Sequence, residues 1–471
     1  MKFNFLGGQH KGFSKNQNSQ ETVNMFLEVD PSEDNKLTLY RVDGKIAFLT
    51  LPTAPIYGMY EFREILYVVA GAYLYKVLND FSYTTIGAID LQFDTTIAAN
   101  NAGQICFNSG VTNKAYVYNT NTSVLAQITD PAFYGSPRVD YLDGYGVFVR
   151  PNTQEFYVSA YNDFLTFDGL EFNSNGSDPD NLVTGIVDHR ELVLFGRKTT
   201  SFWFAVEGTT FSLDRRQGAD MEVGCAAALS VAKLDNTVYF LGRSSHGTGL
   251  VYKLNQYVPQ IISNRGIEHL INSFNVIDDA FAFTYQKSGH SFYVLTFPSE
   301  GKTLVYDASI AEPDLAWHIR GTYQKGRDRA SCYAFAFNRH LVGDFESGTI
   351  YEYDEDTHLD GGQPIAWYRT GQHIIADYKR LRHKEVVLNF ERGVGLESGD
   401  DPLCYLTYSD DGGHTFITPR ECSMGVIGQR KNRTMWARLG QSRDRVYKVF
   451  GSAPVKTVLN GGYIDVEAGK T

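Results

Sequence analysis

Short runs of alternating apolar and polar residues recur along most of the chain. Each run places Tyr, Phe, Val or Leu at every second position and ends in a polar turn close to glycine. Alternation with a period of two gives a β-strand one face for burial, so it predicts strands rather than helices. Seven stretches repeat this unit, and they begin near Ile56, Thr95, Val139, Leu182, Ala227, Asp278 and Cys332.

The spacing of these units predicts a β-propeller. Successive units begin about 40 to 50 residues apart, which is the length of one four-stranded blade. A single blade cannot bury both of its faces, so blades stack around an axis. We therefore expect an all-β protein in which residues 37–359 form a propeller of about seven blades, within a range of six to eight. The last unit is short, and residues 37–50 are expected to add a strand that closes the ring and protects its edges.

The pattern changes after residue 359. Longer alternating strands follow, joined by glycine and aspartate turns, which is typical of a β-sandwich. We place a second, β-rich domain at residues 360–471. Residues 1–36 are rich in Asn, Gln and Ser, and we expect them to form an N-terminal arm that lies over neighbouring surfaces. A helical pattern is confined to residues 266–277, where it is expected to decorate a loop.

Composition and charge narrow the functional classes. The net charge is −11, but residues 363–471 hold 16 Lys and Arg against 12 Asp and Glu, so the excess of acidic residues lies in the preceding part. An acidic body argues against general nucleic-acid binding. The five cysteines are scattered without metal-site spacing, and we expect them to be buried. The N-terminus resembles no secretory signal and no window is apolar enough to span a membrane, so we expect no membrane anchor and assembly in a host cytoplasm.

The sharpest local motif is a single Asp-box, which has the pattern SxDxGxTF. Its residues are Ser409, Asp411, Gly413, Thr415 and Phe416. The carboxylate can accept backbone N–H groups, glycine tolerates a positive φ, and the aromatic ring is expected to anchor the turn. Because the motif occurs once and outside the repeats, we interpret it as a structural turn rather than as a catalytic site.

One acidic stretch is a weak metal candidate. Asp354, Asp356 and Asp360 provide oxygen ligands of the kind that calcium prefers, but Ile365 stands where a calcium loop would place its bidentate glutamate. A solvated turn between domains is the favoured interpretation. The chain also lacks the HExxH, GxSxG, Walker A and GxGxxG motifs. We therefore expect no catalytic residue, no cofactor and no enzymatic activity.

Two basic clusters lie in the C-terminal part and are candidate interface residues. They consist of Lys379, Arg380, Arg382 and Lys384, and of Arg430, Lys431 and Arg433. Charged residues often protect exposed strand edges, which is one interpretation. The alternative is an interface that attracts an acidic partner surface.

Several motifs resemble one family in collinear order, namely the tail hub proteins of short-tailed bacteriophages, also called packaged-DNA stabilisation proteins or tail accessory factors. The segments that carry the resemblance are Val23-Asn24-Met25, Leu39-Tyr40-Arg41 with Asp43-Gly44, Gly185-Ile186 with Phe195-Gly196 and Phe202-Trp203-Phe204, Leu304 to Ser309 (LVYDAS) with Trp317, the turn at 407–412, and Trp436 to Gly440. Asp43 replaces a proline of the family pattern. None of these segments is a catalytic signature.

The resemblance implies a structural protein of the virion tail. It implies a homohexameric ring beneath the portal and its adaptor ring, which retains packaged DNA together with a tail needle and offers docking surfaces for tailspikes. DNA would pass close to an acidic lumen without specific binding.

Two other functions remain open from the sequence. The first is a glycan-binding or glycan-hydrolysing propeller, which would need converging carboxylates, for example Asp140, Asp188 and Asp307. The second is an intracellular propeller that binds proteins and has no part in a virion.

Overall fold

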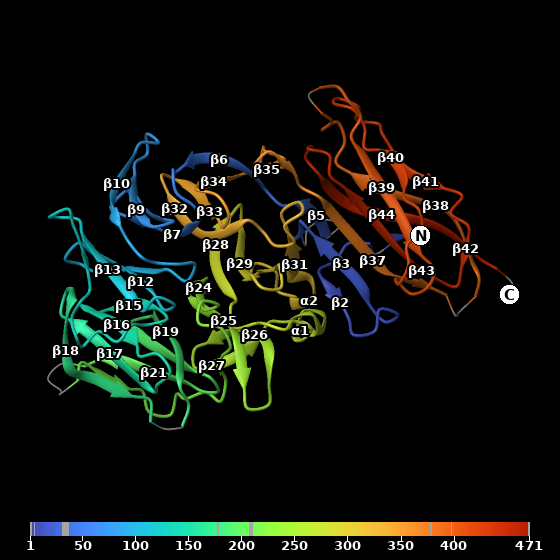
Figure 1. The fold of residues 1–471 in the computed structure, drawn as a ribbon. Helices are drawn as coiled ribbons and strands as arrows, with labels where there is room; N and C mark the ends of the chain where they lie inside the picture. The colour runs from blue at the N-terminus through green and yellow to red at the C-terminus, as the bar shows by residue number, and fades with distance from the viewer. Residues whose placement is uncertain are drawn as a thin grey trace.

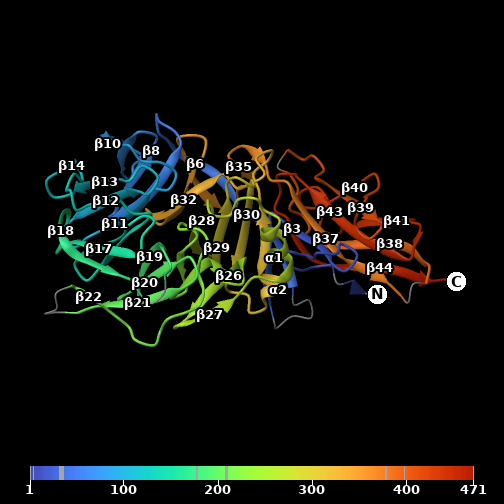
Figure 2. The same cartoon turned by 60° about the horizontal axis from the view of Figure 1, so that its bottom comes forward.

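A computed structural model describes residues 2–3, 5–30, 37–176, 179–206, 211–376, 379–396 and 398–469. Its regular structure is almost entirely β, with a propeller on one side and a second β-rich body on the other (Figure 1). Two short helices are present in the described part, α1 (Arg265–Asn272) and α2 (Pro313–Ala316). They lie where blades five and six meet the N-terminal strands (Figure 2).

The described residues form seven blades of antiparallel neighbours, of which blade six is part of a larger, ten-stranded sheet. The first four blades contain β7 (Ile56–Phe62), β8 (Ile65–Ala70), β9 (Tyr73–Val77) and β10 (Tyr83–Ala88); β11 (Thr96–Ala99), β12 (Gln104–Ser109), β13 (Lys114–Asn119) and β14 (Val124–Gln127); β15 (Val139–Leu142), β16 (Tyr145–Val149), β17 (Glu155–Ala160) and β18 (Asp163–Ser174); β19 (Leu182–Asp188), β20 (Glu191–Gly196), β21 (Thr200–Ala205) and β22 (Leu213–Arg215).

The other three blades are less regular at their edges. They contain β23 (Gly224–Cys225), β24 (Ala232–Leu234), β25 (Thr237–Ser244), β26 (Gly247–Asn255) and β27 (Val258–Ile261); β28 (Phe281–Lys287), β29 (His290–Phe297), β30 (Lys302–Asp307) and β31 (Trp317–Arg320); β32 (Ala330–Ala336), β33 (Arg339–Asp344), β34 (Thr349–Asp354) and β6 (Gly44–Thr50). The predicted fold class and the blade count are confirmed.

The ring closes through two sets of contacts. Most neighbouring blades touch around the axis through their inner strands, blades four and five meet through β20 and β23, and β32 of the last blade contacts β7 of the first. In addition, β6 pairs with β34 and becomes the fourth strand of blade seven, so a strand from near the N-terminus completes the last blade. The preceding segment, β5 (Leu37–Arg41), takes a different course and joins the second body.

The second body is a sandwich of two sheets. One sheet holds β4 (Met25–Val29), β5, β44 (Val458–Ala468), β38 (Leu381–Phe390) and β41 (Thr434–Ala437), with β1 (Lys2–Phe3) and β42 (Gln441–Ser442) at its sides. The other holds β3 (Ser19–Val23), β37 (Trp367–Ile375), β43 (Asp444–Gly451), β39 (Leu403–Ser409) and β40 (Arg420–Ser423), with β2 (His10–Lys11). Two short strands, β35 (Leu359–Asp360) and β36 (Gln363–Pro364), connect propeller and sandwich.

The N-terminal residues differ from the arm that we expected. Strands β3 and β4 are packed elements, and Phe5, Met25 and Leu27 are buried in the same apolar core as Trp367. In β4 the buried residues Met25 and Leu27 stand at alternate positions, whereas the buried residues of β3 are polar, namely Ser19, Gln20 and Thr22. Residues 31–36 of the expected arm lie outside the described part.

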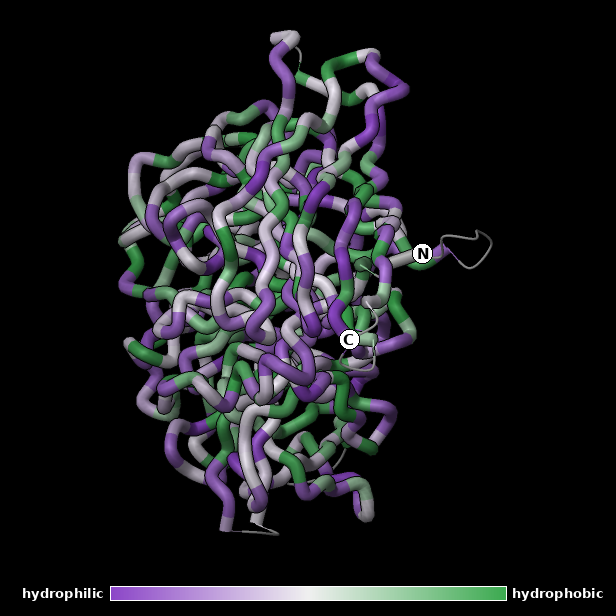
Figure 3. The backbone as a smooth tube through the Cα atoms, turned by 90° about the vertical axis from the view of Figure 1, so that its right-hand side faces the viewer, coloured by the Kyte–Doolittle hydropathy of each residue, from purple (hydrophilic) through white to green (hydrophobic). Residues whose placement is uncertain are grey.

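Apolar clusters lie between neighbouring blades, and the largest one crosses into the sandwich. This cluster includes Tyr239 of blade five, Leu295 of blade six and Val386 of the sandwich. Viewed from the sandwich end, hydrophobic and hydrophilic residues alternate along the backbone (Figure 3). None of the described helices is long and apolar enough to cross a membrane.

Candidate functional site at the junction of propeller and sandwich

Strand β3 joins the propeller and the sandwich by backbone pairing. Val23 pairs in parallel with Ile319 of blade six, and the same strand pairs antiparallel with β37 through Glu21 and Thr370. One ten-stranded sheet therefore runs from blade six through β3 into the sandwich (Figure 1). Propeller and sandwich share hydrogen-bonded backbone at the junction as well as side-chain contacts.

Asn24 fixes the corner that follows β3. Its backbone is left-handed, with a φ of 53°, a conformation that asparagine tolerates better than most residues. The side-chain Nδ2 donates to Gly321 O at 2.8 Å and to Ala366 O at 2.7 Å, while Oδ1 accepts from Gly321 N at 2.9 Å. One amide thus holds the end of blade six and the segment that enters the sandwich. Asn24 is the central residue of the first motif that carries the family resemblance.

Arg369 holds the N-terminal segment against β37 from inside the core. The fully buried guanidinium donates to Phe5 O and Gly8 O at 2.9 Å each, to Thr22 Oγ1 at 2.8 Å, and to Gln20 Oε1. Burial lowers the pKa of Arg369 to about 9, so the group is still charged at neutral pH. Only a planar fork of several N–H groups can serve these acceptors together.

A cluster of buried charges lies under blade seven, next to the junction. Lys45 Nζ lies 3.0 Å from Asp328 and 3.4 Å from Asp360, and Arg329 Nε lies 3.1 Å from the same Asp360 carboxylate. Burial opposes the charge on Lys45, but the two carboxylates outweigh it and raise the pKa of Lys45. Removing one member would leave a buried partner uncompensated.

Asp354 and Asp360, which were considered as metal ligands, have different surroundings. Asp360 points into the buried cluster, where Thr322 Oγ1 also donates to it at 2.6 Å. Asp354 instead closes an exposed turn by accepting from the backbone N–H groups of Asp356 and Thr357. The three carboxylates do not converge, and no group of three or more His, Cys, Asp or Glu side chains suited to a metal occurs among the described residues.

The Asp-box forms a turn after β39 that is held by Asp411. This carboxylate accepts from Ser409 Oγ at 2.6 Å and from the Thr415 backbone N–H at 2.8 Å, as well as from the His414 N–H at 3.0 Å. These hydrogen bonds, led by those of Ser409 and Thr415, hold the pKa of Asp411 well below its usual range. Gly413 N donates to Ser409 Oγ at 2.9 Å.

The Asp-box turn lies against the N-terminal segment. Gly412 has a φ of 75°, and a β-carbon added there would lie 1.8 Å from Asn16 Oδ1. The ring of Phe416 is 38% exposed, so it does not anchor the turn in the core as expected. The preceding residue, Asp410, was not singled out by the motif, yet it binds the buried Arg445 through two contacts of 2.6 Å.

The two basic clusters lie at opposite ends of β38. Residues 379–384 precede and begin this strand, whereas Arg433 is next to Thr434, which pairs with Leu388 near the other end. Lys384 is paired with Glu467 and Arg433 with Glu385. Four other basic side chains are exposed, namely Arg380, Arg382, Arg430 and Lys431. Among the described residues, no carboxylate lies within ion-pair distance of them. Lys379 is exposed as well and donates its backbone N–H to Ala376 O.

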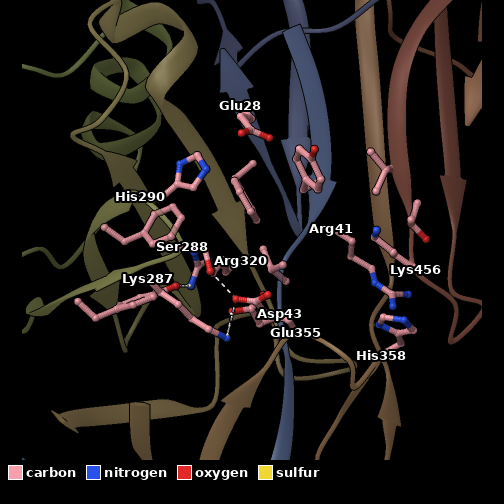
Figure 4. Close-up of a pocket in the computed structure, with 17 residues that line it drawn as sticks. Glu28, Arg41, Asp43, Lys287, Ser288, His290, Arg320, Glu355, His358 and Lys456 are labelled. Atoms are coloured by element: carbon pink, nitrogen blue, oxygen red, sulfur yellow. Dashed lines mark hydrogen bonds and ion pairs between the residues drawn. The ribbon is translucent and has the colours of Figure 1, made fainter. Parts of the chain in front are cut away.

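A cleft of about 320 Å³ opens between blade six and the sandwich sheet that contains β5 (Figure 4). Arg41, His358 and Lys456 line one end, and Lys287 with its partner Asp43 lines the other. Sequence reasoning missed this cleft because its walls come from segments hundreds of residues apart. The only signal was that Arg41 and Asp43 belong to motifs that carry the family resemblance.

The three carboxylates considered for a glycan hydrolase each have a different partner. Asp140 accepts from the Val187 backbone N–H, and Asp188 is paired with the exposed His189. Asp307 lies in blade six, where it is fully buried against His290 at 2.6 Å. Asp307 therefore does not face a cleft together with the other two.

Several solved structures resemble part of the chain at a distance. The virginiamycin B lyase from Staphylococcus aureus is 10% identical, with a TM-score of 0.43 and coverage of 65% of this chain and 97% of the lyase. YCF48 bound to D1 peptide is 11% identical, with a TM-score of 0.41 and coverage of 67% and 98%. The computationally designed Ika8 protein is 13% identical, with a TM-score of 0.38 and coverage of 71% and 99%. TM-scores this low give no indication of function.

Family models match both parts of the chain, although no curated protein does. The model described as bacteriophage P22 Gp10, beta-propeller, matches residues 1–358, and the one described as bacteriophage P22 Gp10, beta-sandwich, matches residues 366–467. The two matches follow the order in which propeller and sandwich occur. The chain therefore belongs to the bacteriophage P22 Gp10 family, the tail hub and packaged-DNA stabilisation proteins.

Proposed function

We propose that this chain forms the hub of a short phage tail as a ring of six identical subunits. The ring attaches below the portal and adaptor ring, retains the packaged DNA, and docks the tail needle and tailspikes. Subunits are made and assembled in the host cytoplasm and then reside in the virion tail. The role is structural rather than catalytic.

The observation that carries this proposal is the sheet shared by propeller and sandwich. Domains of one chain usually meet through side-chain contacts that allow relative motion. Here β3 pairs with both bodies, and Met25 and Trp367 belong to a core that extends into blade six. A subunit that transmits force between the portal–adaptor complex and the tailspikes would need this kind of rigid connection.

The distribution of charge supports passage of DNA rather than tight binding. Residues 1–362, which contain the propeller, carry 27 Lys and Arg against 42 Asp and Glu, so their net charge is negative. Phosphates are bound by basic side chains, and an acidic lumen would repel them weakly. Reversing the charge of carboxylates that face the lumen should slow genome ejection, and an unchanged ejection rate would argue against this part of the proposal.

The unpaired basic residues of the sandwich support a docking surface for acidic proteins. Arg380 and Arg382 lie near one end of β38, and Arg430 and Lys431 lie near the other. Exposed charges of this kind act mainly on the rate of association and its dependence on salt.

The proposal can be tested by assembly in vitro. The purified full-length chain is mixed with a portal–adaptor complex and examined by cryo-electron microscopy and mass photometry. We expect a six-fold ring bound on the side away from the portal. A chain that stays monomeric in the presence of the complex, or a ring of different symmetry, would contradict the proposed assembly.

A parallel assay tests the structural role. Sialosides and bacterial polysaccharides are incubated with the chain and their products are separated by chromatography. No turnover is expected, because Asp140, Asp188 and Asp307 do not share a cleft. Hydrolysis that is lost on substitution of one of these aspartates would instead support a glycan-processing propeller.

A further inference from the structure

The cleft between blade six and the sandwich contains a cation without a counter-ion. Arg41 is the last residue of β5 and is only 8% exposed. Its Nη1 donates to Ala453 O at 2.9 Å, but its Nη2 is shielded from solvent and has no hydrogen-bond partner. Among the described residues no carboxylate lies within ion-pair distance of this guanidinium. A buried polar group without a partner is rare in folded proteins and indicates that something is missing.

The other groups at this end of the cleft are also donors. Figure 4 shows His358 and Lys456 beside Arg41 on the same side of the cleft. Lys456 is half exposed and pairs with Glu391 at 3.0 Å, so a bound oxyanion would share this lysine with Glu391. His358 can donate a ring N–H. These three side chains come from β5, from the loop after β34, and from the segment before β44.

The opposite end of the cleft differs because its charges are already balanced. Lys287 Nζ lies 2.8 Å from Asp43 and 3.7 Å from Glu355. It also donates to Tyr353 O at 3.2 Å. An incoming anion would therefore find a compensated lysine at one end and an uncompensated arginine at the other.

We propose that this cleft binds an oxyanion, a carboxylate or phosphate group, between Arg41, His358 and Lys456. An arginine fork is the side chain best suited to two oxygens of one such group. The bound oxygens would supply the acceptor that Nη2 lacks. The cleft volume of about 320 Å³ exceeds a single phosphate ion, so it also admits the side chain of an acidic residue.

The first test measures binding of inorganic phosphate and of acetate to the full-length chain by isothermal titration calorimetry. We expect saturable binding of at least one of the two anions, with affinity reduced tenfold or more in Arg41→Gln and in Lys456→Gln. Lys456 is half exposed, so its variant is expected to fold even if Arg41→Gln does not. Arg41→Lys keeps a positive charge but loses the fork, and it should bind with intermediate affinity.

The matched control is Lys287→Gln, which removes a lysine from the same cleft at the end that is already balanced. Its affinity for phosphate and acetate should stay within about twofold of the unmodified chain. The proposal is overturned if the unmodified chain binds neither anion saturably, or if Lys287→Gln weakens binding as much as Lys456→Gln does.

A second arm distinguishes the source of the anion. Ring assembly is followed by mass photometry with and without saturating phosphate. If the cleft accepts a carboxylate from a neighbouring subunit, phosphate and Lys456→Gln should both slow assembly. If it takes a free anion, assembly should be unchanged while calorimetric binding is still present. Either result supports the oxyanion site, and the first test remains decisive even if the proposed six-fold ring does not form.

Discussion

Asn24 and Gly321 exchange two hydrogen bonds across the junction, one in each direction. Asn24 Nδ2 donates to Gly321 O at 2.8 Å, and Gly321 N donates to Asn24 Oδ1 at 2.9 Å. A side chain therefore imitates the backbone pairing that an antiparallel strand would provide at the end of β31. The corner keeps its shape because both polar groups of the amide are used.

Replacing Asn24 with alanine should destabilise the fold by about 3 kcal/mol. The change removes three hydrogen bonds, leaves partly buried backbone groups of Gly321 and Ala366 without these partners, and strains a left-handed backbone. Asn24→Gly loses the same three hydrogen bonds but relieves the backbone strain, so it should cost about 1 kcal/mol less than Asn24→Ala. Urea denaturation measures the loss of stability in the two variants.

Asn113→Ala is the control, because Asn113 has a similar φ of 51° in an exposed turn. A loss of stability in Asn113→Ala as large as that in Asn24→Ala would contradict the role of the Asn24 amide.

Arg369→Lys should be destabilising even though it retains the positive charge. A lysine ammonium cannot reach Phe5 O, Gly8 O and Thr22 Oγ1 together, so buried acceptors lose their partners at a cost of about 2 to 4 kcal/mol. Hydrogen exchange measured by mass spectrometry should show the greatest loss of protection in residues 5–22. A loss of protection confined to β37 would contradict the proposed anchoring of the N-terminal segment.

The blades could be predicted because their signal is local. Alternation within six residues decides which face of a strand is buried, and the observed strands at Ile56, Val139 and Leu182 begin where the pattern begins. The partners of β3 could not be predicted in the same way. Val23 pairs with Ile319, and nothing near residue 23 specifies a partner at that distance in the sequence.

The same limit explains what was missed at the candidate sites. Asp354 and Asp360 are close in sequence, but one closes an exposed turn and the other faces Lys45 in a buried cluster. Residue spacing predicts that a turn is present, but it does not predict the direction in which each carboxylate points. The cleft around Arg41 requires the final arrangement of propeller and sandwich, so no single segment indicates it.

Stability should decrease in acid because of His383. This side chain is buried, with Ser442 Oγ 2.8 Å from Nε2 and the Tyr447 hydroxyl 2.9 Å from Nδ1. Burial, assisted by Arg445, lowers the pKa of His383 to about 3. Between pH 6.5 and 3 the unfolded chain therefore binds one proton more at this histidine than the folded chain does. The stability that neutral His383 contributes to the fold is complete above pH 6.5 and is lost as the pH falls toward 3.

The contribution of His383 is isolated by comparing the unmodified chain with His383→Gln in urea at several pH values. The variant should be less stable at pH 7, and the difference between the two proteins should shrink as the pH falls below 6.5. His414→Gln, at an exposed position, serves as the control. A difference that stays constant with pH would show that His383 does not titrate in this way.

Two neighbouring aspartates should have different effects when each is changed to asparagine. Asp410→Asn leaves the buried Arg445 without its carboxylate and should cost about 2 kcal/mol of global stability, since Asp410 itself is partly exposed. Asp411→Asn weakens only the Asp-box turn, where it should speed amide exchange at His414 and Thr415 without a comparable global loss. Chemical denaturation measures the loss of global stability, and hydrogen exchange measures the local opening of the turn. An equal loss of global stability in the two variants would contradict these separate roles of Asp410 and Asp411.

Charge reversal at one end of β38 should slow attachment to the rest of the tail. Arg430 and Lys431 are exposed and have no ion-pair partner among the described residues, so their reversal should leave the fold intact and affect only the proposed docking surface. The double substitution Arg430→Glu and Lys431→Glu should reduce the association rate with the portal–adaptor complex on the order of tenfold at low salt and less at high salt. Surface plasmon resonance at two ionic strengths measures the association rate and its dependence on salt.

The control is Lys114→Glu, which reverses the charge of a propeller lysine that is already paired with Asp90. If the two variants slow association equally, the effect reflects total charge and the basic end of β38 is not a docking surface.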